Sequence, residues 1–430
     1  MPGTRSQSRA SPARACALSV IRRVFEQGAY ADRAFAAEAA GLEPRDRALA
    51  MALAFGTVQR RATIDHVAAR LTDRRLNRLD APVLASLRLG LFELLYLGGA
   101  AEHAAVNENV ELVKRAHPHA VGLVNAVLRR ATREGPGILA ELDDRSPEAA
   151  ALLHSVPGWL ASQWWEELGA DEARALLRVV NEPAESALRV NSLVAATSEV
   201  AAALPVPSSP AANLPEGLVL KGPFDVQGSE LWQSGAVQPQ SRASMLVSRI
   251  LEPQPRERVL DMCAAPGGKT THLAALMGGM GEVVAVERHP GRASALTRTV
   301  ERMRATSVRI EVGDAAVLRS DGPFDRVLVD PPCSGLGTLQ SRPDLRWRAR
   351  PEAIGELAAL QARILAAGAQ ALAPGGTLVY SVCTISRAEG DAVIDAFLRE
   401  HGEFVAEGRL QLLPHRDGTD GFFIARLRRE

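Results

Sequence analysis

The stretch that decides the fold of this 430-residue chain reads Val259-Leu260-Asp261-Met262-Cys263-Ala264-Ala265-Pro266-Gly267-Gly268-Lys269-Thr270. An apolar run ends at an acidic residue, and a glycine-rich turn then leads into a helical pattern, as at a strand-to-helix turn. Strand-like and helix-like patterns alternate from Val259 onward, and this alternation predicts a parallel sheet covered by helices. Further strands are expected at residues 283–286, 308–312, 326–329 and 377–380, with a closing antiparallel pair near 411–413 and 422–425.

The glycine-rich turn is suited to a nucleoside-like ligand. Gly267 and Gly268 let the backbone approach a ligand closely, and the helix N-terminus that follows favours a carboxylate. Glu287 ends the next predicted strand, where an acidic side chain accepts hydrogen bonds from a ribose diol. Asp314 follows the third strand and is placed to accept from an adenine amino group. An adenosine without phosphates fits this set, and S-adenosylmethionine is such a ligand; the alternative is that both acids are ordinary solvated loop residues. The candidate cofactor residues are Cys263, Ala264, Ala265, Pro266, Gly267, Gly268, Lys269, Glu287 and Asp314.

The same turn is one residue short of a phosphate-binding loop. The pattern G-x-x-x-x-G-K-[ST] requires glycine where Cys263 stands, because that position lets the loop wrap phosphate with its backbone amides. The run Val327-Leu328-Val329-Asp330 even resembles the acidic strand that holds magnesium in such enzymes. A nucleotide hydrolase that binds ATP with magnesium is therefore an alternative function.

Two cysteines follow two other predicted strands. Cys333 lies in Asp330-Pro331-Pro332-Cys333-Ser334-Gly335, and Cys383 lies in Tyr380-Ser381-Val382-Cys383-Thr384. Ligands bind at the carboxyl ends of strands in open α/β sheets, so we expect the two thiols to face one substrate.

A thiol pair beside a methyl donor indicates methyl transfer to a pyrimidine. Carbon C5 of cytosine is too electron-poor to attack a methyl sulfonium unaided, and a thiolate that adds at C6 makes C5 nucleophilic. Asp330 is placed to protonate or hydrogen-bond N3, and the second thiol to assist release. The residues alone do not say whether Cys333 or Cys383 attacks, and for each the alternative is a small buried apolar side chain.

The bulk composition limits the other functions. Formal net charge is zero, so no whole-chain field favours a polyanion, although arginine pairs occur in the first third. The cysteines, Cys16 and Cys263 included, do not form a disulfide framework, and none has metal-ligand spacing with a histidine, so no metal is expected. The chain fits a reducing cytoplasm. The N-terminus lacks the apolar core of a signal peptide, and no stretch is apolar enough to span a bilayer.

Three parts are expected along the chain. Residues 1–140 show helical spacing, with Pro44 and Pro82 at helix starts, and Gly135-Pro136-Gly137 is interpreted as part of a linker. Residues 141–242 predict a small α+β domain with helices at 159–168 and 171–180, a strand at 186–190 and a turn-rich, mobile stretch at 204–210. Residues 243–430 form the α/β part.

The C-terminal half resembles the RNA cytosine-C5 methyltransferases of the Nol1/Nop2/Sun family. The resemblance implies a Rossmann-like class I methyltransferase domain that uses S-adenosylmethionine, with Cys383 as nucleophile, Cys333 in product release and Asp330 at the base. It also implies that the turn residues, Glu287, Asp314 and Asp330 hold the cofactor. The family usually has Asp-Ala-Pro-Cys where this chain has Asp330-Pro331-Pro332-Cys333. The matching motifs are the glycine-rich turn, the two cysteine motifs, Arg342-Pro343-Asp344-Leu345-Arg346-Trp347 and Asp420-Gly421-Phe422-Phe423.

The helical front resembles the RNA-binding fold of NusB. The matching stretches are Glu43-Pro44-Arg45-Asp46-Arg47-Ala48-Leu49-Ala50 and Gly122-Leu123-Val124-Asn125-Ala126-Val127-Leu128-Arg129-Arg130. A NusB-like front joined to such a catalytic half is the arrangement of bacterial enzymes that methylate cytosine C5 in small-subunit (16S) rRNA, which implies rRNA as partner. Nothing in the sequence suggests an obligate interface or a membrane span, so a monomer with no membrane partner is expected. The alternatives are an inactive RNA-binding adaptor, or an enzyme acting on tRNA or 23S rRNA. Amino-methyltransferases also carry Asp-Pro-Pro, but they need no thiol pair.

The segment after the Cys333 motif has two interpretations. Arg342, Arg346, Trp347 and Arg348 mix cations with an aromatic ring, a composition suited to RNA backbone contact and base stacking. The alternative is that Trp347 packs into a core. The substrate base itself is expected flipped or single-stranded, because C5 and C6 are blocked within a stack.

Overall fold

The computed structural model describes residues 11–98, 102–317 and 322–430, without the side chains of Arg115 and Ala116. The predicted N-terminal features before Ser11 lie outside these residues. The chain forms two compact units. The helical unit runs to Glu182 and includes the later segment Leu339–Arg348, and the sheet unit comprises Pro183–Thr338 and Ala349–Glu430. The two units are described separately below.

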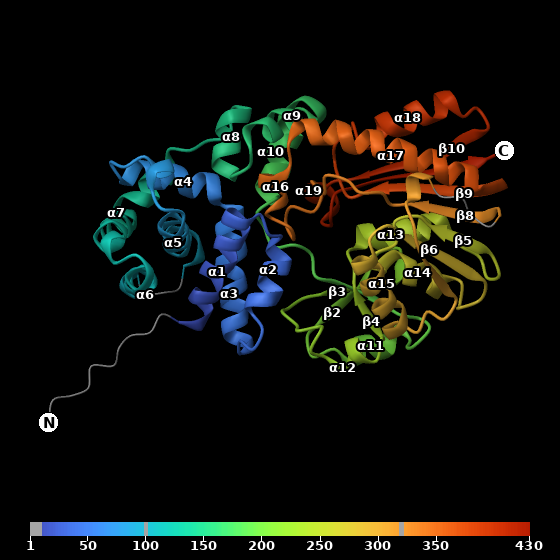
Figure 1. Cartoon of the computed structure of the whole chain (residues 1–430), viewed down its shortest axis with the longest axis horizontal. Coiled ribbons are helices and arrows are strands. Elements are labelled where there is room, and N and C mark those ends of the chain that lie inside the picture. The colour runs from blue at the N-terminus through green and yellow to red at the C-terminus, as the bar shows by residue number, and fades with distance from the viewer. Residues whose placement is uncertain (1–10, 99–101, 318–321) are drawn as a thin grey trace. The chain divides into compact units, whose positions relative to one another are not determined.

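The helical unit consists of packed helices, as its periodicity predicted (Figure 1, blue to green). Ser11 and Ser146 cap α1 and α8 through their hydroxyl oxygens, and Pro44 starts α3. The fully buried Val20, Leu53 and Leu87 pack in its core. Its helices are α1 (Pro12–Gln27), α2 (Ala31–Glu38), α3 (Pro44–Gln59), α4 (Arg61–Leu71), α5 (Ala81–Phe92), α6 (Glu102–Ala116), α7 (Val121–Ala140), α8 (Pro147–His154), α9 (Gly158–Leu168), α10 (Ala170–Val179) and α16 (Leu345–Arg348), with short turns η1 (Leu76–Arg78), η2 (Glu93–Leu97) and η3 (Pro118–Ala120).

The interpretation of Gly135-Pro136-Gly137 as a linker was wrong. All three residues lie inside α7, which continues to Ala140. A Cβ on Gly135 would lie 2.6 Å from Cδ2 of Leu95, so this glycine lets α7 approach η2 closely. Tertiary packing here overrides the local preference of the three residues for a turn.

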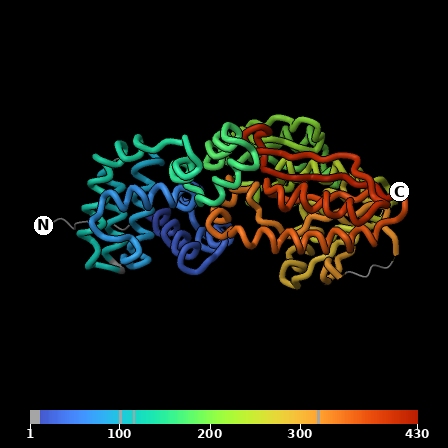
Figure 2. The backbone as a smooth tube through the Cα atoms, turned by 90° about the horizontal axis from the view of Figure 1, so that it is seen from above, coloured from blue at the N-terminus to red at the C-terminus, as the bar shows by residue number. Residues whose placement is uncertain are grey.

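The sheet unit is built on a seven-stranded sheet in the order β10-β11-β9-β8-β5-β6-β7. The strands from β9 to β7 are parallel, and β11 and β10 add antiparallel, side by side as the red segments of Figure 2 show. The predicted α/β fold and closing hairpin are thereby confirmed. The strands are β5 (Arg258–Asp261), β6 (Glu282–Glu287), β7 (Val308–Val312), β8 (Phe324–Val329), β9 (Leu372–Val382), β10 (Phe404–Leu412) and β11 (Phe422–Arg429).

Helices cover both faces of this sheet (Figure 1). α13 (Arg242–Leu251), α14 (Gly268–Leu276) and α15 (Pro290–Arg302) pack on one face over residues such as Val259 and Val379. α17 (Pro351–Ala371) and α18 (Asp391–Glu400) pack on the other. The central strands β5 and β6 and the C-terminal parts of β8 and β9 are therefore buried on both sides, which explains their almost continuous apolar runs. The edge strands β7 and β10 are more exposed. The remaining short elements of this part are η4 (Ala315–Val317) and α19 (Pro414–Asp417).

A second, four-stranded antiparallel sheet in the order β2-β3-β1-β4 belongs to the same unit. The stretch 204–210 was predicted to be a mobile turn, but Ser208–Ala211 forms strand β2. Pro210 is tolerated there because β2 lies at the sheet edge, where a missing backbone N–H costs no ladder bond. The elements of this sheet are β1 (Ala187–Val190), β2 (Ser208–Ala211), β3 (Leu214–Leu220) and β4 (Val237–Pro239), with helices α11 (Thr197–Ala203) and α12 (Glu230–Gln233).

Among the described residues, no helix combines the length and apolarity needed to cross a membrane. The domain boundaries expected from the sequence at residues 140 and 242 remain predictions.

Candidate active site

The carboxyl ends of the central strands form the candidate site. β5 lies between β8 on one side and β6 on the other, and the chain runs from β5 to β6 but reaches β8 only later. Such a reversal of strand order opens a crevice at the strand ends, where ligands bind in this class of sheet. Asp330 follows β8 directly and Cys383 follows β9, its parallel neighbour. The fold therefore brings the predicted residues to one edge.

The two predicted thiols lie against each other. Sγ of Cys333 is 3.2 Å from Sγ of Cys383, and both cysteines are half-buried and not joined in a disulfide. The hydrogen bond to Cys383, together with burial, raises the pKa of Cys333 well above its usual range. The thiol form of Cys333 is therefore favoured, and the two sulfur atoms share a hydrogen bond in which either can be the donor.

Asp330 is fixed from two sides. Nζ of Lys269 donates to its Oδ2 at 2.8 Å, and Oγ of Ser381 donates to its Oδ1 at 2.8 Å. Burial lowers the pKa of Lys269, but the attraction of Asp330 outweighs it and the pKa is raised. A lysine of the glycine-rich turn thus joins the carboxylate that follows β8. In the phosphate-loop alternative this ammonium would serve phosphate instead, so its bond to Asp330 argues against that alternative.

A buried carboxylate supports the Cys333 loop from behind. Glu389 is fully buried and accepts from the backbone N–H of Ser334 at 2.8 Å and from Nε2 of Gln361 at 3.0 Å. The hydroxyl of Ser334 also donates to Glu389, at 2.5 Å, and that of Tyr380 donates to its carbonyl at 2.6 Å. The sequence interpretation missed Glu389, because a single acid before a glycine is indistinguishable from an exposed loop residue.

The glycine-rich turn adopts the geometry that its sequence predicted. Gly267 has φ 105°, and a Cβ there would lie 2.9 Å from Cδ1 of Leu296, so only glycine fits. Thr270 Oγ1 donates to Oδ2 of Asp261 at 2.7 Å. Oδ1 of Asp261 is buried without a hydrogen-bond partner among the described residues, and burial raises the pKa of this carboxyl to about 6. The turn therefore retains a buried acceptor that a ligand donor would satisfy.

The two other predicted cofactor acids follow neighbouring parallel strands. Glu287 ends β6, is buried, and accepts from the backbone N–H of His289 at 2.8 Å. Asp314 follows β7, is half-buried, and accepts from the backbone N–H of Ala316 at 3.0 Å. With the turn after β5, three adjacent strand ends thus present the groups proposed for an adenosine ligand. The residues present fit S-adenosylmethionine.

Cys263 differs from the thiol pair. Burial raises its pKa, and the nearby carboxylates of Asp261, Asp330 and Glu287 add to the effect. A thiol held in this way stays protonated and is a poor nucleophile.

Arg189 of strand β1 reaches the same turn and was also missed. Its Nε donates to Oε1 of Gln240 at 2.8 Å, and Nη2 donates to Oγ1 of Thr271 at 2.9 Å and to the carbonyl of Gly268 at 3.4 Å. The side chain is fully buried, and burial lowers its pKa to about 9. The four-stranded sheet is thereby tied to the first turn of α14.

Two residues of the segment for which RNA contact was considered are instead packed inside the helical unit, whereas Arg342 and Arg348 are exposed. Arg346 is fully buried, and Nε1 of Trp347 donates to the carbonyl of Val58 at 2.7 Å. The RNA-contact interpretation is therefore wrong for Arg346 and for the half-buried Trp347, and the packing alternative holds. The guanidinium of Arg346 donates, over 2.7 to 3.3 Å, to Oδ1 of Asn181 and to the carbonyls of Gln59, Ser155, Val180 and Leu339.

Three family models match the chain. Residues 248–428 match the model of the 16S rRNA methyltransferase RsmB/F, residues 11–133 match the NusB family, and residues 156–227 match the ferredoxin-like domain of RsmF/B-like methyltransferases. The fold class predicted for all three parts is thereby confirmed.

Full-length relatives agree with these matches. The ribosomal RNA small subunit methyltransferase B of Thermus thermophilus is 36% identical and covers 98% of this chain, as this chain covers 98% of it. The solved structure of the protein PH0851 superposes with a TM-score of 0.81 at 29% identity, over 98% of this chain and 100% of that one. NSun6 from Pyrococcus horikoshii, solved with SFG, gives a TM-score of 0.60 at 22% identity over 64% of this chain and 99% of that one, which supports the fold.

Proposed function

The chain belongs to the RsmB/F family of 16S rRNA methyltransferases, enzymes that use S-adenosylmethionine, and on that premise we propose that it methylates C5 of a cytosine through a covalent bond between Cys383 and C6. The observation that carries the proposal is the pair of sulfur atoms 3.2 Å apart beside Asp330. S-adenosylmethionine, when bound, supplies an electrophilic methyl group. All other steps fall to residues of this chain and to the base.

Cys383 is the nucleophile in this proposal. Its thiolate forms a bond to C6, the C5–C6 double bond opens, and C5 becomes electron-rich enough to take the methyl group. Cys333 is less suited to attack, because its raised pKa keeps it a thiol. The hydrogen bond from Cys333 also stabilises negative charge on the sulfur of Cys383.

Asp330 serves the cytosine ring. When the thiolate adds, negative charge develops toward N3, and a carboxyl group beside N3 offsets it by a hydrogen bond or a proton. Lys269 and Ser381 hold the two carboxylate oxygens in place and so fix the direction of the remaining lone pairs. In the proposed step Asp330 donates a proton to N3 as the charge develops, is left as a carboxylate bonded to Lys269 and Ser381, and takes the proton back when the adduct collapses.

Product release requires a base. The proton on C5 must leave before the C5–C6 double bond re-forms and the sulfur of Cys383 departs. Cys333 is placed at the adduct by its contact with Cys383. In the proposed step Cys333 first loses its thiol proton to solvent, and the resulting thiolate then accepts the C5 proton, which restores the thiol. The products are 5-methylcytosine and the original thiol pair.

Small-subunit rRNA is the proposed substrate, because the curated relatives carry that activity in their names and the helical front matches NusB. A tRNA or 23S rRNA target is the second candidate, since the thiol chemistry is the same on any flipped cytosine.

The test is a trapping experiment with Cys333→Ala. The variant is incubated with total rRNA and S-adenosylmethionine and run on a denaturing gel. We expect a stable protein–RNA band that is lost when Cys383→Ala is added, because addition proceeds but release does not. The control is Cys16→Ala, a buried cysteine of the helical unit, which should turn over like the wild type.

The other outcomes are informative as well. A band from Cys383→Ala alone would reverse the two roles. No band from either variant, with both still folded and the wild type active, would contradict a release role for the second thiol. Sequencing of trapped RNA identifies the target and separates 16S rRNA from tRNA or 23S rRNA.

A further inference from the structure

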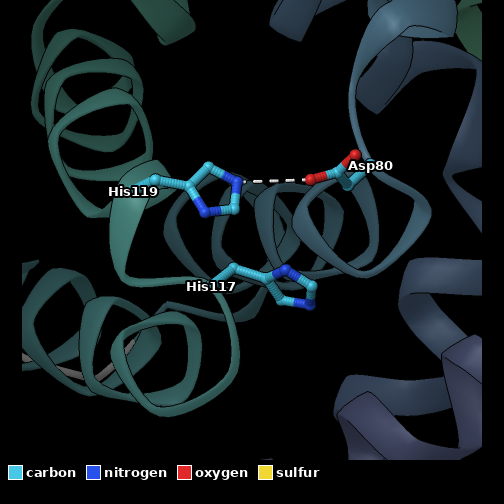
Figure 3. A group of neighbouring side chains, drawn as sticks. All are labelled: Asp80, His117 and His119. Carbon is cyan, nitrogen blue, oxygen red and sulfur yellow. Dashed lines mark hydrogen bonds and ion pairs between the residues drawn. The ribbon is translucent and has the colours of Figure 1, made fainter.

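Three potential metal ligands meet on the surface of the helical unit, whereas the site described above belongs to the sheet unit. They are Asp80, His117 and His119, whose ligand atoms all lie within 4.8 Å of one another. Figure 3 shows the His119 ring and the Asp80 carboxylate facing each other, with the His117 ring beside them. The sequence interpretation expected no metal, because it considered histidines only in spacing with cysteines, and this group contains no cysteine.

The three side chains come from two connections that are distant in sequence. Asp80 directly precedes α5, and His117 and His119 flank Pro118 in the turn that leads into α7. Proline fixes the backbone between the two imidazoles, so the pair is presented with little freedom. The carboxylate of Asp80 and the two imidazoles are therefore brought together by the folding of the helical unit and not by proximity in sequence.

Asp80 behaves unlike an ordinary helix-capping residue. Aspartate is among the preferred residues at an N-cap, where its side chain accepts from a backbone N–H of the first turn. Asp80 occupies the N-cap of α5, yet its side chain makes no capping hydrogen bond. Its Oδ2 lies instead 3.3 Å from Nε2 of His119. The carboxylate of Asp80 therefore lies beside the His119 imidazole instead of capping α5.

The separation of these two atoms suits a shared ion. A typical N–H···O hydrogen bond is shorter, about 2.9–3.0 Å. Two ligands on a tetrahedral zinc ion, each about 2.0–2.1 Å from the metal, lie about 3.3 Å apart. The observed 3.3 Å between Oδ2 of Asp80 and Nε2 of His119 matches that edge. The ligand atom of His117 lies within 4.8 Å of the other two, and its ring lies edge-on to that of His119 with the centroids 5.9 Å apart, so His117 can supply a third ligand.

From these observations we propose that Asp80, His117 and His119 form a binding site for a divalent transition-metal ion, with zinc as the best match. Two imidazoles and one carboxylate are a ligand set that zinc accepts readily. The side chains of His119 and Asp80 are 69% and 58% exposed, so the ion can enter from solvent and water can fill the fourth position. The bound ion would link the start of α5 to the turn before α7 and so stabilise the helical unit.

The test uses the full chain without a histidine tag and zinc chloride or cobalt chloride as the probe. Isothermal titration of the double variant H117Q/H119Q should give an affinity lower on the order of tenfold or more than that of the wild type. The melting temperature of the wild type should rise with zinc, and that of the double variant should not. D80N should fall between the two, because it keeps both imidazoles.

Two controls separate this site from other ligands in the chain. H103Q removes an exposed histidine from α6 of the same unit and should leave zinc binding unchanged. C333S/C383S removes the thiol pair, which can itself hold zinc. Cobalt distinguishes the two sites, because a thiolate ligand adds a sulfur-to-metal charge-transfer band in the near ultraviolet that a nitrogen and oxygen site lacks.

The expected result is one equivalent of metal that remains in C333S/C383S and is lost in H117Q/H119Q. Equal zinc affinity in the wild type and in H117Q/H119Q would overturn the proposal, as would cobalt spectra that show thiolate ligation alone. Since none of the substituted side chains is fully buried, the far-ultraviolet circular dichroism of the variants without metal should equal that of the wild type.

Discussion

Each unit of this molecule contains a fully buried arginine, and the two buried positive charges are stabilised by different kinds of partner. Arg346 holds the segment Leu339–Arg348 inside the helical unit, and Arg189 holds the four-stranded sheet to the glycine-rich turn. Burial lowers the pKa of each to about 9. Nε of Arg346 and Nη1 of Arg189 each have no hydrogen-bond partner among the described residues. Neither arginine makes a direct ion pair with a carboxylate in the described part of the chain.

Arg346 is satisfied by the ends of helices. Gln59 is the last residue of α3, and Ser155 and Val180 cap the C-termini of α8 and α10. The last carbonyls of a helix have no intrahelical donor, and they carry the negative end of the helix dipole. A guanidinium with five donors can serve several such ends at once. The charge is thus balanced by partial charges of the backbone.

Arg189 relies on side chains and lies at the opposite end of a helix. Its partners Gly268 and Thr271 belong to the first turn of α14, where the dipole is positive and disfavours a cation. A carboxylate nearby offsets this: Glu216 raises the pKa of Arg189, although burial has the larger effect. Glu216 in turn binds His272 and Arg249. In this molecule a buried cation without a direct ion pair is thus stabilised either by carbonyls at helix C-termini or by a network of nearby charges.

The largest effect is expected from Arg346→Met. The variant leaves several buried carbonyls without donors, each costing about 1–3 kcal/mol, so we expect a loss of about 3–5 kcal/mol in the free energy of unfolding. Urea unfolding measures it, with Arg342→Met on the exposed neighbour as the matched control. Arg346→Lys should recover little, since an ammonium has three donors and no planar fork. An unchanged stability would mean that the cost of burying the charge cancels its hydrogen bonds.

A smaller effect, of a different kind, is expected from Arg189→Met. Fewer acceptors lose their donor, but one of them is the carbonyl of Gly268 in the proposed cofactor turn. We expect the dissociation constant for S-adenosylmethionine to rise about tenfold, which corresponds to about 1.4 kcal/mol. Isothermal titration calorimetry measures it, with the exposed Arg363→Met on α17 as control. If Arg346→Met weakened cofactor binding equally, the two arginines would not have separate roles.

These two arginines also mark what the sequence could and could not predict. The alternation of strands and helices, the closing hairpin and the meeting of Cys333, Cys383 and Asp330 followed from local patterns, because periodicity and strand ends are encoded in neighbouring residues. The partners of Arg189 and Arg346 are distant in sequence, so no local pattern revealed them. The basic and aromatic composition of the motif that contains Arg346 is compatible with RNA contact as well as with packing, so the sequence left both interpretations open.

The sequence analysis missed the buried carboxylate of Glu389 and misplaced Gly135 in a linker, and both errors have the same reason. Glu389 is polar yet fully buried, and its donors Ser334 and Gln361 lie in other elements. Gly135 looks like a turn residue until Leu95 of another element occupies the space beside it. Composition predicts exposure and turns correctly on average, whereas specific tertiary contacts decide such exceptions.

The smallest effect concerns pH and follows from the charge network near Arg189. Burial lowers the pKa of His272 to about 4, and the charge of Arg189 adds to the effect, so His272 is neutral in the folded chain at neutral pH. As pH falls below 6.5, the usual histidine value, the unfolded chain binds a proton that the folded chain does not, and the free energy of unfolding decreases. The bonds from His272 and Arg249 hold the pKa of Glu216 below its usual range even though burial opposes them, so further acidification acts in the same direction.

His272→Gln should reduce this pH dependence. Glutamine keeps a donor for Glu216 but does not titrate, so between pH 6.5 and about 5.5 the variant should lose about 1 kcal/mol less stability than the wild type. Hydrogen exchange of β5 amides across that range measures the effect in the sheet unit. The amides of α5 in the helical unit are the internal control, because Arg346 has no titrating network of this kind among the described residues. An equal slope in both units would place the acid-sensitive group elsewhere, and an unchanged slope in the variant would show that His272 is protonated in the folded chain.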